Sequence, residues 1–310
     1  MSAANATPFH GIYPSIICPL NADYSIDEAA LAKHIAAVTD VPGIVGILCN
    51  GHAGENFSLT RRERRRVTEV SRRTLDRHMI VVAGVNCENS LEAVVHAQDA
   101  KVAGADAVMV FAPNSWSMTQ DETMAINHHR MIAEAVDIPI MLFQGSVRAG
   151  RTAYMPDILS RLVKLPNVVA IKEGSWETCA YEATRRLVKD VAPQVAIMAS
   201  GDEHLFTCYV LGSEGSLVSL AVLIPETIVA LDQAVRRGDL LAARAAHDII
   251  YPLARAIYGA PPPGHATARL KTCLKLLGRL ESDVVRPPIG PLANEEVAML
   301  QDALEVAGLL

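Results

Sequence analysis

The chain has few of the features that mark specialised classes of protein. No apolar run approaches the ~20 residues that a membrane-spanning helix needs, and no apolar core of a signal peptide follows the polar N-terminus. With a net charge of −6, the chain offers no general attraction to nucleic acid. None of its six cysteines has a C-x-x-C neighbour, which favours buried, reduced thiols. We therefore expect a soluble cytoplasmic protein with neither membrane nor nucleic-acid partners.

Metal-ligand patterns are absent too. Neither His-Glu-x-x-His nor a paired Cys/His spacing occurs, so we expect no metal site. His128, His129 and Arg130 fall within a helical pattern, and a solvated helix face is the simplest explanation for this polar cluster. The dense run of arginines between residues 61 and 73 also follows a helical pattern and is interrupted by glutamates. That composition favours a solvated face or a subunit contact.

What the chain does contain is a regular alternation of apolar runs and amphipathic stretches. Eight runs have the composition of buried strands, at residues 11–20, 43–49, 79–85, 107–111, 139–143, 168–173, 195–200 and 215–219. Helical patterns follow them, most clearly at residues 26–38, 60–75, 90–103 and 121–136. No Gly-x-Gly-x-x-Gly follows the first run, which argues against a dinucleotide-binding doubly wound sheet. The alternation predicts an α/β fold, a (β/α)8 TIM barrel.

The C-terminal part of the chain has a different pattern. It is helical throughout and is broken by a Pro-Pro-Pro-Gly segment; its helical patterns cover residues 240–258, 266–277 and 294–307. We therefore place the barrel at residues 1–237. The remainder, residues 238–310, is expected to be a three-helix extension packed on the barrel.

Start signals support the helix assignments in the barrel. Ser25 with Glu28 and Thr60 with Glu63 have the spacing of capping boxes, in which each side chain bonds the other's backbone N–H. Ser90 is placed to cap the third helix. These residues predict where the first three helices begin.

Lys172 is the most informative single residue, because it lies at the end of the apolar run V-V-A-I-K-E. Burial in a parallel strand penalises the ammonium form and lowers the pKa of a lysine. A neutral amine is a nucleophile that condenses with a ketone to give an imine. The alternative is a strand-end lysine whose head group reaches water. The segment alone leaves both interpretations open.

Other polar and glycine-rich segments follow the predicted strands. In a (β/α)8 barrel the active site forms at the C-terminal ends of the strands. G-H-A-G-E follows the second strand at residues 51–55, and F-Q-G ends the fifth at 143–145. S-G-D-E follows the seventh strand at 200–203, and L-G-S-E-G leads into the eighth at 211–215.

In their order and spacing these motifs resemble the dihydrodipicolinate synthase and N-acetylneuraminate lyase family. The resemblance extends from about residue 9 to the C-terminus and depends on G-x-x-G-E, I-K-E, S-G-D and L-G-x-x-G. It implies a (β/α)8 barrel with C-terminal helices, usually assembled as a homotetramer. It also implies that Lys172 forms a Schiff base with a 2-oxo acid, with no metal or organic cofactor.

The same resemblance gives the loop after the second strand a role. Residues Gly51 to Ala53 would bind the carboxylate of pyruvate or a similar acid, since small residues let backbone N–H groups approach an anion. The alternative is a tight turn that needs glycine. The family usually has hydroxyl residues at the two central positions, where this chain has His52 and Ala53. Glu55 would orient the loop.

The chain departs from the family where tyrosines usually move protons. Phe143 takes the place of the usual tyrosine on the fifth strand, and a phenyl ring carries no exchangeable proton. Asn114 and Ser115 replace the paired tyrosines that often follow the fourth strand. We consider His52 the substitute proton carrier, because it titrates near neutral pH. The alternative is a histidine that only hydrogen-bonds substrate.

The resemblance implies roles for Arg148, Gly201 and Leu217, and the chemistry of Gln144 makes it a further candidate. Arg148 aligns with an arginine that contacts a second substrate's carboxylate, with a surface loop arginine as the alternative. Gln144 could hydrogen-bond a hydroxylated substrate. Gly201 would allow close approach of the backbone to substrate, and the backbone of Leu217 would lie near the Schiff-base lysine. Asp202, beside Gly201, is expected to cap the helix that follows.

The sequence thus favours a Schiff-base lyase that acts on pyruvate or a related 2-oxo acid by aldol cleavage, aldol addition or dehydration. A 2-keto-3-deoxy sugar-acid dehydratase or aldolase fits at least as well, because its substrate has hydroxyls that the polar loop residues could bind. A third interpretation is a barrel that binds a 2-oxo acid without turnover. The missing hydroxyl relay favours that interpretation, and the retained Lys172 argues against it.

Overall fold

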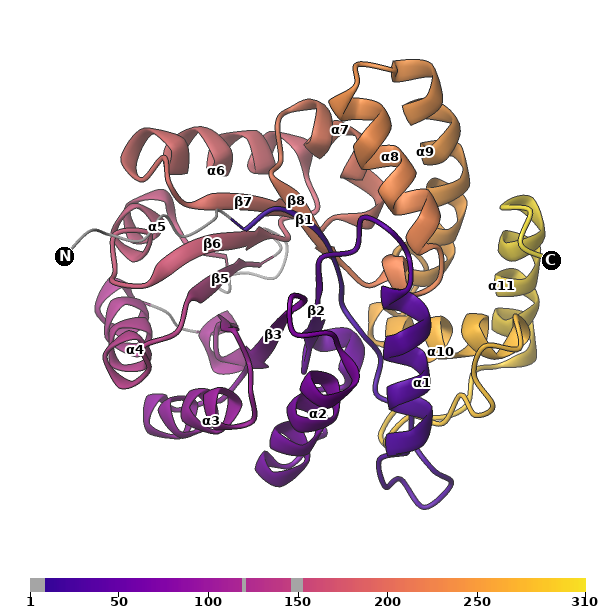
Figure 1. The fold of residues 1–310 in the computed structure, drawn as a ribbon, viewed down its shortest axis with the longest axis horizontal. Helices are drawn as coiled ribbons and strands as arrows, with labels where there is room; N and C mark the ends of the chain where they lie inside the picture. The colour runs from indigo at the N-terminus through magenta and orange to yellow at the C-terminus, as the bar shows by residue number, and fades with distance from the viewer. Residues whose placement is uncertain (1–8, 119–120, 146–152) are drawn as a thin grey trace.

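The computed structural model describes residues 9–118, 121–145 and 153–310. Within them, eight parallel strands form one sheet in the order β1-β8-β7-β6-β5-β4-β3-β2 (Figure 1). Bridges from Ile12 to Ile44 and from Ser15 to Leu48 join the two ends of this sheet into a barrel. The strands are β1 (Gly11–Pro14), β2 (Gly46–Cys49), β3 (Ile80–Val85), β4 (Ala107–Val110), β5 (Ile140–Gln144), β6 (Val168–Glu173), β7 (Ala196–Ala199) and β8 (Gly215–Val218).

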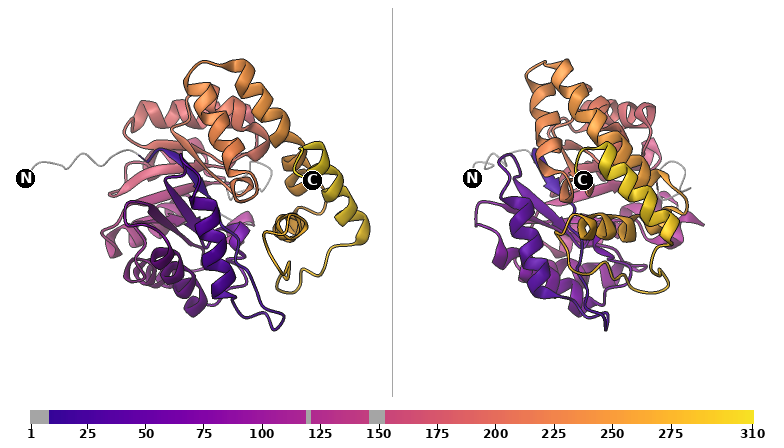
Figure 2. Two further views of the ribbon diagram at one scale, coloured as in Figure 1. Left: turned by 45° about the vertical axis from the view of Figure 1, so that its right-hand side comes forward. Right: turned by 90° about the vertical axis from the view of Figure 1, so that its right-hand side faces the viewer.

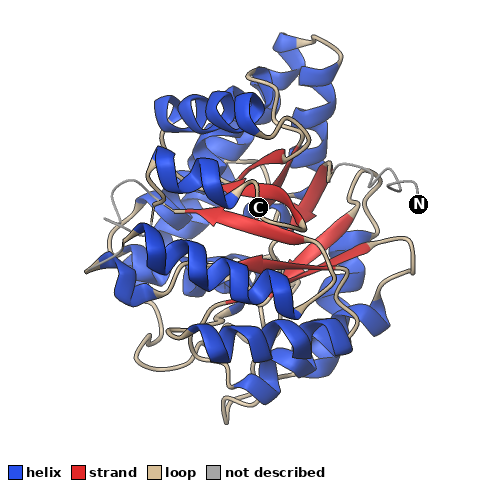
Figure 3. Cartoon of the chain, turned by 90° about the vertical axis from the view of Figure 1, so that its left-hand side faces the viewer, coloured by secondary structure: helices blue, strands red, loops and turns tan. Residues whose placement is uncertain are grey.

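Helices alternate with the strands and enclose them, as Figure 3 shows. Those around the barrel are α1 (Glu28–Thr39), α2 (Arg61–Thr74), α3 (Ser90–Val102), α4 (Glu122–Ala135), α5 (Pro156–Leu162), α6 (Thr178–Val191), α7 (Leu205–Val210) and α8 (Pro225–Arg236). The C-terminal helices are α9 (Leu240–Ala254), α10 (Ala266–Leu276) and α11 (Asn294–Val306). The predicted (β/α)8 TIM barrel with C-terminal helices is therefore confirmed.

Most strands are shorter than their apolar runs, and the first differs most. The run at 11–20 forms a ladder only over β1 (Gly11–Pro14). Pro14 and Pro19 have no backbone N–H to donate, so a longer ladder would be interrupted twice. By contrast, β6 occupies the predicted residues 168–173.

Two of the three caps predicted for the first three helices are wrong. Thr60 and Glu63 do form a capping box at the start of α2. Helix α1, however, is capped by Asp27, which accepts from the backbone N–H of Ala30 at 2.9 Å. Helix α3 is capped by Asn89 rather than by Ser90. In both cases a competent Asp or Asn is adjacent to the expected residue or nearby, and sequence spacing does not decide between such neighbours.

The protein buries apolar side chains in two layers. The barrel interior contains a cluster of Tyr13, Leu48, Val82, Ala107, Met109, Phe111, Met141, Ala170, Ala196, Met198 and Leu217. A larger cluster lies between the strands and the surrounding helices. Of the six cysteines, which are all free, Cys179 is exposed and the others are buried. No helix in the described ranges is long and apolar enough to cross a bilayer.

The prediction that His128 and His129 lie on a solvated helix face is wrong. Both are buried on the inner side of α4, although the neighbouring Arg130 is exposed. His129 Nδ1 lies 2.9 Å from the carbonyl oxygen of Ala125, and its Nε2 lies 3.1 Å from the hydroxyl of Tyr154. Burial lowers the pKa of both histidines, so they pack as neutral rings.

The C-terminal helices return to the end of the barrel where the strands finish. Figure 2 shows α10 and α11 beside the barrel, with α9 alongside α8. Helix α9 continues into a π-helical turn, η6 (Arg255–Gly259), which brings Tyr258 to the segment after β8. Helix α10 packs against a 3-10 turn after β2, η1 (His52–Gly54). The division at residue 237 stays a prediction, but these contacts tie the extension to both loops.

Candidate active site

Lys172 is buried in the barrel wall at the end of β6, with 8% of its surface exposed. It is paired in register with Phe143 on β5 and Met198 on β7, and its Nζ lies 5.7 Å from the centre of the Phe143 ring. The amine forms no ion pair with any residue that the structure describes. Burial lowers the pKa of Lys172 to about 8, a shift that the charge of Asp202 opposes. A substantial fraction of the amine is therefore neutral near physiological pH.

The loop after β2 forms a cradle of backbone donors, residues Gly51 to Gly54. Gly54 N–H donates to the carbonyl oxygen of Gly51 at 3.1 Å. The N–H groups of His52 and Ala53 donate to no atom in the described part of the chain, so they are available to an anion. A Cβ at position 51 would lie 2.9 Å from the Ser15 hydroxyl oxygen, so this close packing requires glycine.

Glu55 fixes this cradle to the C-terminal helices. The carboxylate is buried and accepts from the Lys271 amine and from the backbone N–H of Arg286, the latter at 2.9 Å. Lys271 is 0% exposed and also donates to the carbonyl oxygen of Val284 at 2.7 Å. A hydroxyl of the same helix, from Thr267, lies 3.4 Å from the carbonyl oxygen of His52. The extension thus contacts the cradle itself.

Sequence reasoning missed Lys271, although a signal for it exists. It lies in the segment R-L-K-T-C-L of α10, between Leu270 and Leu274, which are both buried. Residues 270 and 274 are four apart and mark one helix face, with Lys271 beside it. A lysine next to such a face needs a buried acidic partner, but the partner is 216 residues away.

Aromatic rings form the wall of the site on the β4 and β5 side. The His52 ring stacks on Phe111 with centres 4.4 Å apart, and it meets the edge of Phe143 at 5.5 Å and Phe57 at 4.8 Å. Desolvation by these rings and the charge of Lys172 lower the pKa of His52, although the residue retains exposed surface. His52 is therefore a neutral base at pH 7, and both it and Lys172 lie near the Phe143 ring.

The β7 and β8 side of the site has ionisable and hydroxyl groups instead. Asp202, in the turn η4 (Asp202–His204), is 2% exposed, and its Oδ1 accepts from the backbone N–H of Leu220 at 3.1 Å. Ser219 lies 2.7 Å, oxygen to oxygen, from the Tyr258 hydroxyl. The predicted helix cap is wrong, because Asp202 bonds the turn after β8 and no side chain caps α7. Sequence reasoning also missed Ser219 and Tyr258.

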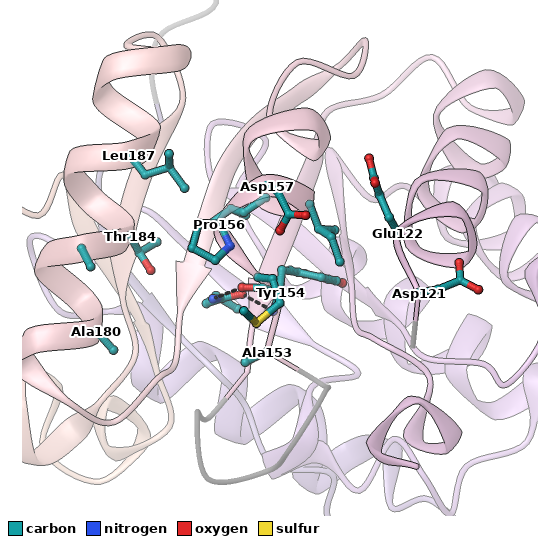
Figure 4. A pocket seen from close by; sticks show the side chains of 14 residues that line it. Asp121, Glu122, Ala153, Tyr154, Pro156, Asp157, Ala180, Thr184 and Leu187 are labelled. Carbon is teal, nitrogen blue, oxygen red and sulfur yellow. Dashed lines mark hydrogen bonds between the residues drawn. The ribbon is translucent and has the colours of Figure 1, made fainter. Parts of the chain in front are cut away.

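Gln144 is not brought to the site. Its side chain exchanges two hydrogen bonds with the backbone of Tyr154, at 2.9 and 3.1 Å (Figure 4). Together with residues of α5 and α6 it lines a cavity of about 630 Å³ outside the barrel, which the acidic side chains of Asp121, Glu122 and Asp157 also border. Lys172 does not line this cavity.

The remaining predicted residues have mixed positions. Asn114 and Ser115 lie in a turn after β4 whose backbone N–H groups both donate to Glu88 at 3.0 Å. Leu217 is buried in the barrel interior. A Cβ at Gly201 would meet its nearest neighbour at 3.7 Å, so packing does not demand glycine there. Arg148 lies outside the described residues.

Metal binding needs several ligand side chains close together. Among the residues with described positions, no three His, Cys, Asp or Glu side chains are placed to hold a metal ion.

With this geometry in place, comparison with known proteins identifies the family. Residues 8–307 match the model of the Dihydrodipicolinate synthetase family. The chain belongs to this family. It is 30% identical over 296 residues to the 4-hydroxy-tetrahydrodipicolinate synthase of Methanothrix thermoacetophila, covering 96% of each chain. It is 29% identical to an uncharacterized DapA-like lyase of Halobacterium salinarum over 97% of this chain and 95% of the relative.

Solved structures of the dihydrodipicolinate synthetase family agree. YagE, a prophage protein of this family from E. coli K12 in complex with pyruvate, superimposes with a TM-score of 0.89 at 26% identity, covering 97% of this chain and 99% of that one. A putative dihydrodipicolinate synthetase from Pseudomonas aeruginosa gives 0.86 at 27% identity, with 96% and 99% covered. At the level of the family, these relatives support lyase activity on a small molecule.

Proposed function

We propose that this protein forms an imine between Lys172 and the carbonyl carbon of pyruvate or a related 2-oxo acid, and then makes or breaks a bond next to that carbon. The observation that carries the proposal is the buried amine of Lys172, which has no ion-pair partner among the described residues. The charge of this amine lowers the pKa of His52, a residue of the backbone cradle. Both side chains contact the Phe143 ring, so the amine and the cradle border the same space.

The proposed chemistry begins when the neutral amine adds to the ketone carbon. The substrate carboxylate is held by the free N–H groups of His52 and Ala53. Loss of water gives a protonated imine, which withdraws electrons from the neighbouring carbon. A carbon–carbon bond at the next carbon can then break with formation of an enamine, and the enamine can add to an aldehyde in the reverse direction. For dehydration, the next carbon instead loses a proton to give the enamine, which then expels the hydroxyl of the following carbon as water. Neutral His52 takes up the proton that is released when a substrate hydroxyl becomes a carbonyl.

The substrate class is also a proposal. The complex of YagE with pyruvate supports a 2-oxo acid as the core of the substrate. Because Phe143 replaces a tyrosine, we favour a hydroxylated 2-oxo acid such as a 2-keto-3-deoxy sugar acid over the synthase reaction. In this proposal Asn114 and Ser115, in the turn after β4, bind its hydroxyls. We further propose, from the family, a homotetramer in the cytoplasm that needs no metal or organic cofactor.

A panel of acids tests this function. The protein is incubated with pyruvate, oxaloacetate or 3-deoxy-2-oxo sugar acids, reduced with borohydride and weighed by mass spectrometry. Release of product is assayed in parallel without borohydride. We expect covalent adducts with several acids and turnover with at least one hydroxylated acid. If no acid of the panel forms an adduct, the proposal fails.

The second candidate function, binding of a 2-oxo acid without turnover, is favoured by the loss of the tyrosine hydroxyl at Phe143. The same panel decides between them. Adducts with every acid but product from none would indicate a binding protein, since imine formation alone does not require the later proton transfers.

A further inference from the structure

Imine formation needs an acid that the aromatic side of the site does not supply. The amine first adds to the ketone, and the hydroxyl of the resulting carbinolamine must be protonated before it leaves as water. Phe111 and Phe143 have no exchangeable proton. His52 stacks on Phe111, and desolvation together with the Lys172 charge lowers its pKa, so it is neutral and has no acidic proton to give. The proton must therefore come from elsewhere in the barrel mouth.

The opposite side of the mouth contains a buried carboxyl group. Asp202 follows β7, the strand next to the one that carries Lys172. Only one of its oxygens, Oδ1, accepts a hydrogen bond from the neighbouring turn, at Leu220. Its carboxyl group accepts no hydrogen bond from any side chain in the described part of the chain.

We propose that Asp202 is the acid that completes imine formation at Lys172, an inference that rests on the proposed function. Asp202 is buried after the strand next to the lysine strand, is held in place by the turn after β8, and forms no ion pair with any described residue. Lys172 is the only cation in the described residues whose charge acts on it. In this role Asp202 takes over from the tyrosine that the family usually has on β5, where this chain has Phe143.

The step balances in protons and electrons. The neutral amine adds its electron pair to the carbonyl carbon, and the nitrogen passes one proton to the new alkoxide, which becomes the carbinolamine hydroxyl. Protonated Asp202 then gives its proton to that hydroxyl. The carbon–oxygen bond breaks, water leaves, and the nitrogen electron pair forms the carbon–nitrogen double bond. The products are a cationic imine and an Asp202 carboxylate, which attract each other.

The protonation states of the pair suit this exchange. Burial raises the pKa of Asp202 to about 7, and burial lowers that of Lys172 to about 8. The other groups that act on Asp202 are Glu203, which disfavours its charged form, and the hydroxyl of Tyr258, which is neutral because burial raises its pKa. The reactive form has one proton on the acid and none on the amine. Imine formation is therefore fastest between the two titrations of the pair.

The test measures how fast borohydride traps the imine with pyruvate, from pH 5.5 to 9.5. Asp202→Asn keeps an oxygen for the Leu220 N–H but cannot give up a proton. We expect trapping to slow about 100-fold or more, the usual range for loss of a general acid. The alkaline limb of the pH profile should also disappear, so that the trapping rate rises with pH to a plateau set by deprotonation of Lys172. Asp232→Asn, which changes a buried carboxyl group on α8, is the matched control and should trap like the unaltered protein.

The outcomes separate this inference from the proposed function. If the unaltered protein traps no pyruvate or other 2-oxo acid, both are overturned. If it traps normally and Asp202→Asn has the same rate and pH profile, only the role of Asp202 is overturned. Should the variant fail to fold, the unaltered protein still decides: a fall in trapping rate above about pH 8 supports the acid, and a rate that only rises with pH overturns it.

Discussion

The barrel interior and the seam between the barrel and the C-terminal helices each bury a lysine, and they do so in opposite ways. In the seam, Lys271 is fully buried against Glu55 and the carbonyl oxygen of Val284. In the interior, Lys172 is almost as buried but has no ion-pair partner among the described residues. Aromatic and apolar neighbours surround it instead.

The comparison shows how partner choice separates a structural lysine from a reactive one. A partner within hydrogen-bond distance compensates a buried charge and keeps the ammonium form. Without a partner, burial favours the neutral amine, as the lowered pKa of Lys172 indicates. The two sites are also connected, because Glu55 holds the cradle in which the substrate carboxylate is proposed to bind. The predictions below test this contrast, from the largest expected effect to the smallest.

The largest effect is expected on activity at Lys172. Lys172→Met removes the nucleophile and should lower turnover on the order of 10⁴-fold or more. Its melting temperature should be unchanged or higher, because the substitution removes an uncompensated polar group from an apolar wall. Activity assays and calorimetry on the same preparation measure both. A strongly destabilised variant would show that Lys172 is structural after all.

In the seam the expected effect is on stability. Lys271→Met leaves the Glu55 carboxylate buried without its partner, which should cost about 3–5 kcal/mol of unfolding free energy. Lys271→Met combined with Glu55→Gln removes both charges and should recover part of the loss. Lys275→Met breaks the exposed pair with Asp283 and serves as the control, with a loss below about 1 kcal/mol. Equal losses from Lys271→Met and Lys275→Met in urea titrations would refute the contrast.

A His52 variant distinguishes the proton transfer of imine formation, assigned to Asp202, from the later proton transfer, assigned to His52. His52→Ala should lower turnover about 100-fold if the ring is the base for the later step. The rate at which borohydride traps pyruvate should not change, because the backbone donors of the cradle and Asp202 are retained. Full turnover in His52→Ala would remove the histidine from the proton relay and leave it a packing role against Phe111.

The pH dependence of stability gives the smallest effect. The Lys172 pKa is lower in the folded protein, about 8, than the ordinary lysine value of 10.5. Between these values the unfolded chain binds more protons, so the folded state gains stability as pH rises from about 8 to 10.5 and loses that gain as pH falls. Compared with Lys172→Met, the unaltered protein should gain roughly 1 kcal/mol per pH unit in this window. The unfolding free energy of both proteins is measured by denaturant titration at several pH values. The same pH dependence for both proteins would contradict the lowered pKa.

The contrast between the lysines also explains what the sequence could predict. The strand around Lys172 was predicted at its observed bounds, because an apolar run that ends in lysine is a local signal. The anchoring of Glu55 by Lys271 was not predicted, since the pair joins residues 216 apart in sequence. Tyr258 reaches Ser219 only because α9 continues into a π-helical turn, which no residue pattern indicated.

Local signals also failed where burial depended on neighbouring elements. His128 and His129 follow a polar helix pattern but pack against Trp116 and Tyr154, which come from two other segments. Gln144 follows Phe143 on the same strand, and the alternation of side chains turns it to the outer face of the barrel. Knowledge of the strand register would have corrected the prediction for Gln144. The burial of the two histidines could be found only from the tertiary structure.

One measurement tests the central claim most directly. The protein is incubated with pyruvate and borohydride, digested, and sequenced by tandem mass spectrometry to locate the modified lysine. We predict a single reduced adduct on the peptide that contains Lys172 and none on the peptide that contains Lys271. No adduct on Lys172, or equal labelling of both lysines, would contradict the account.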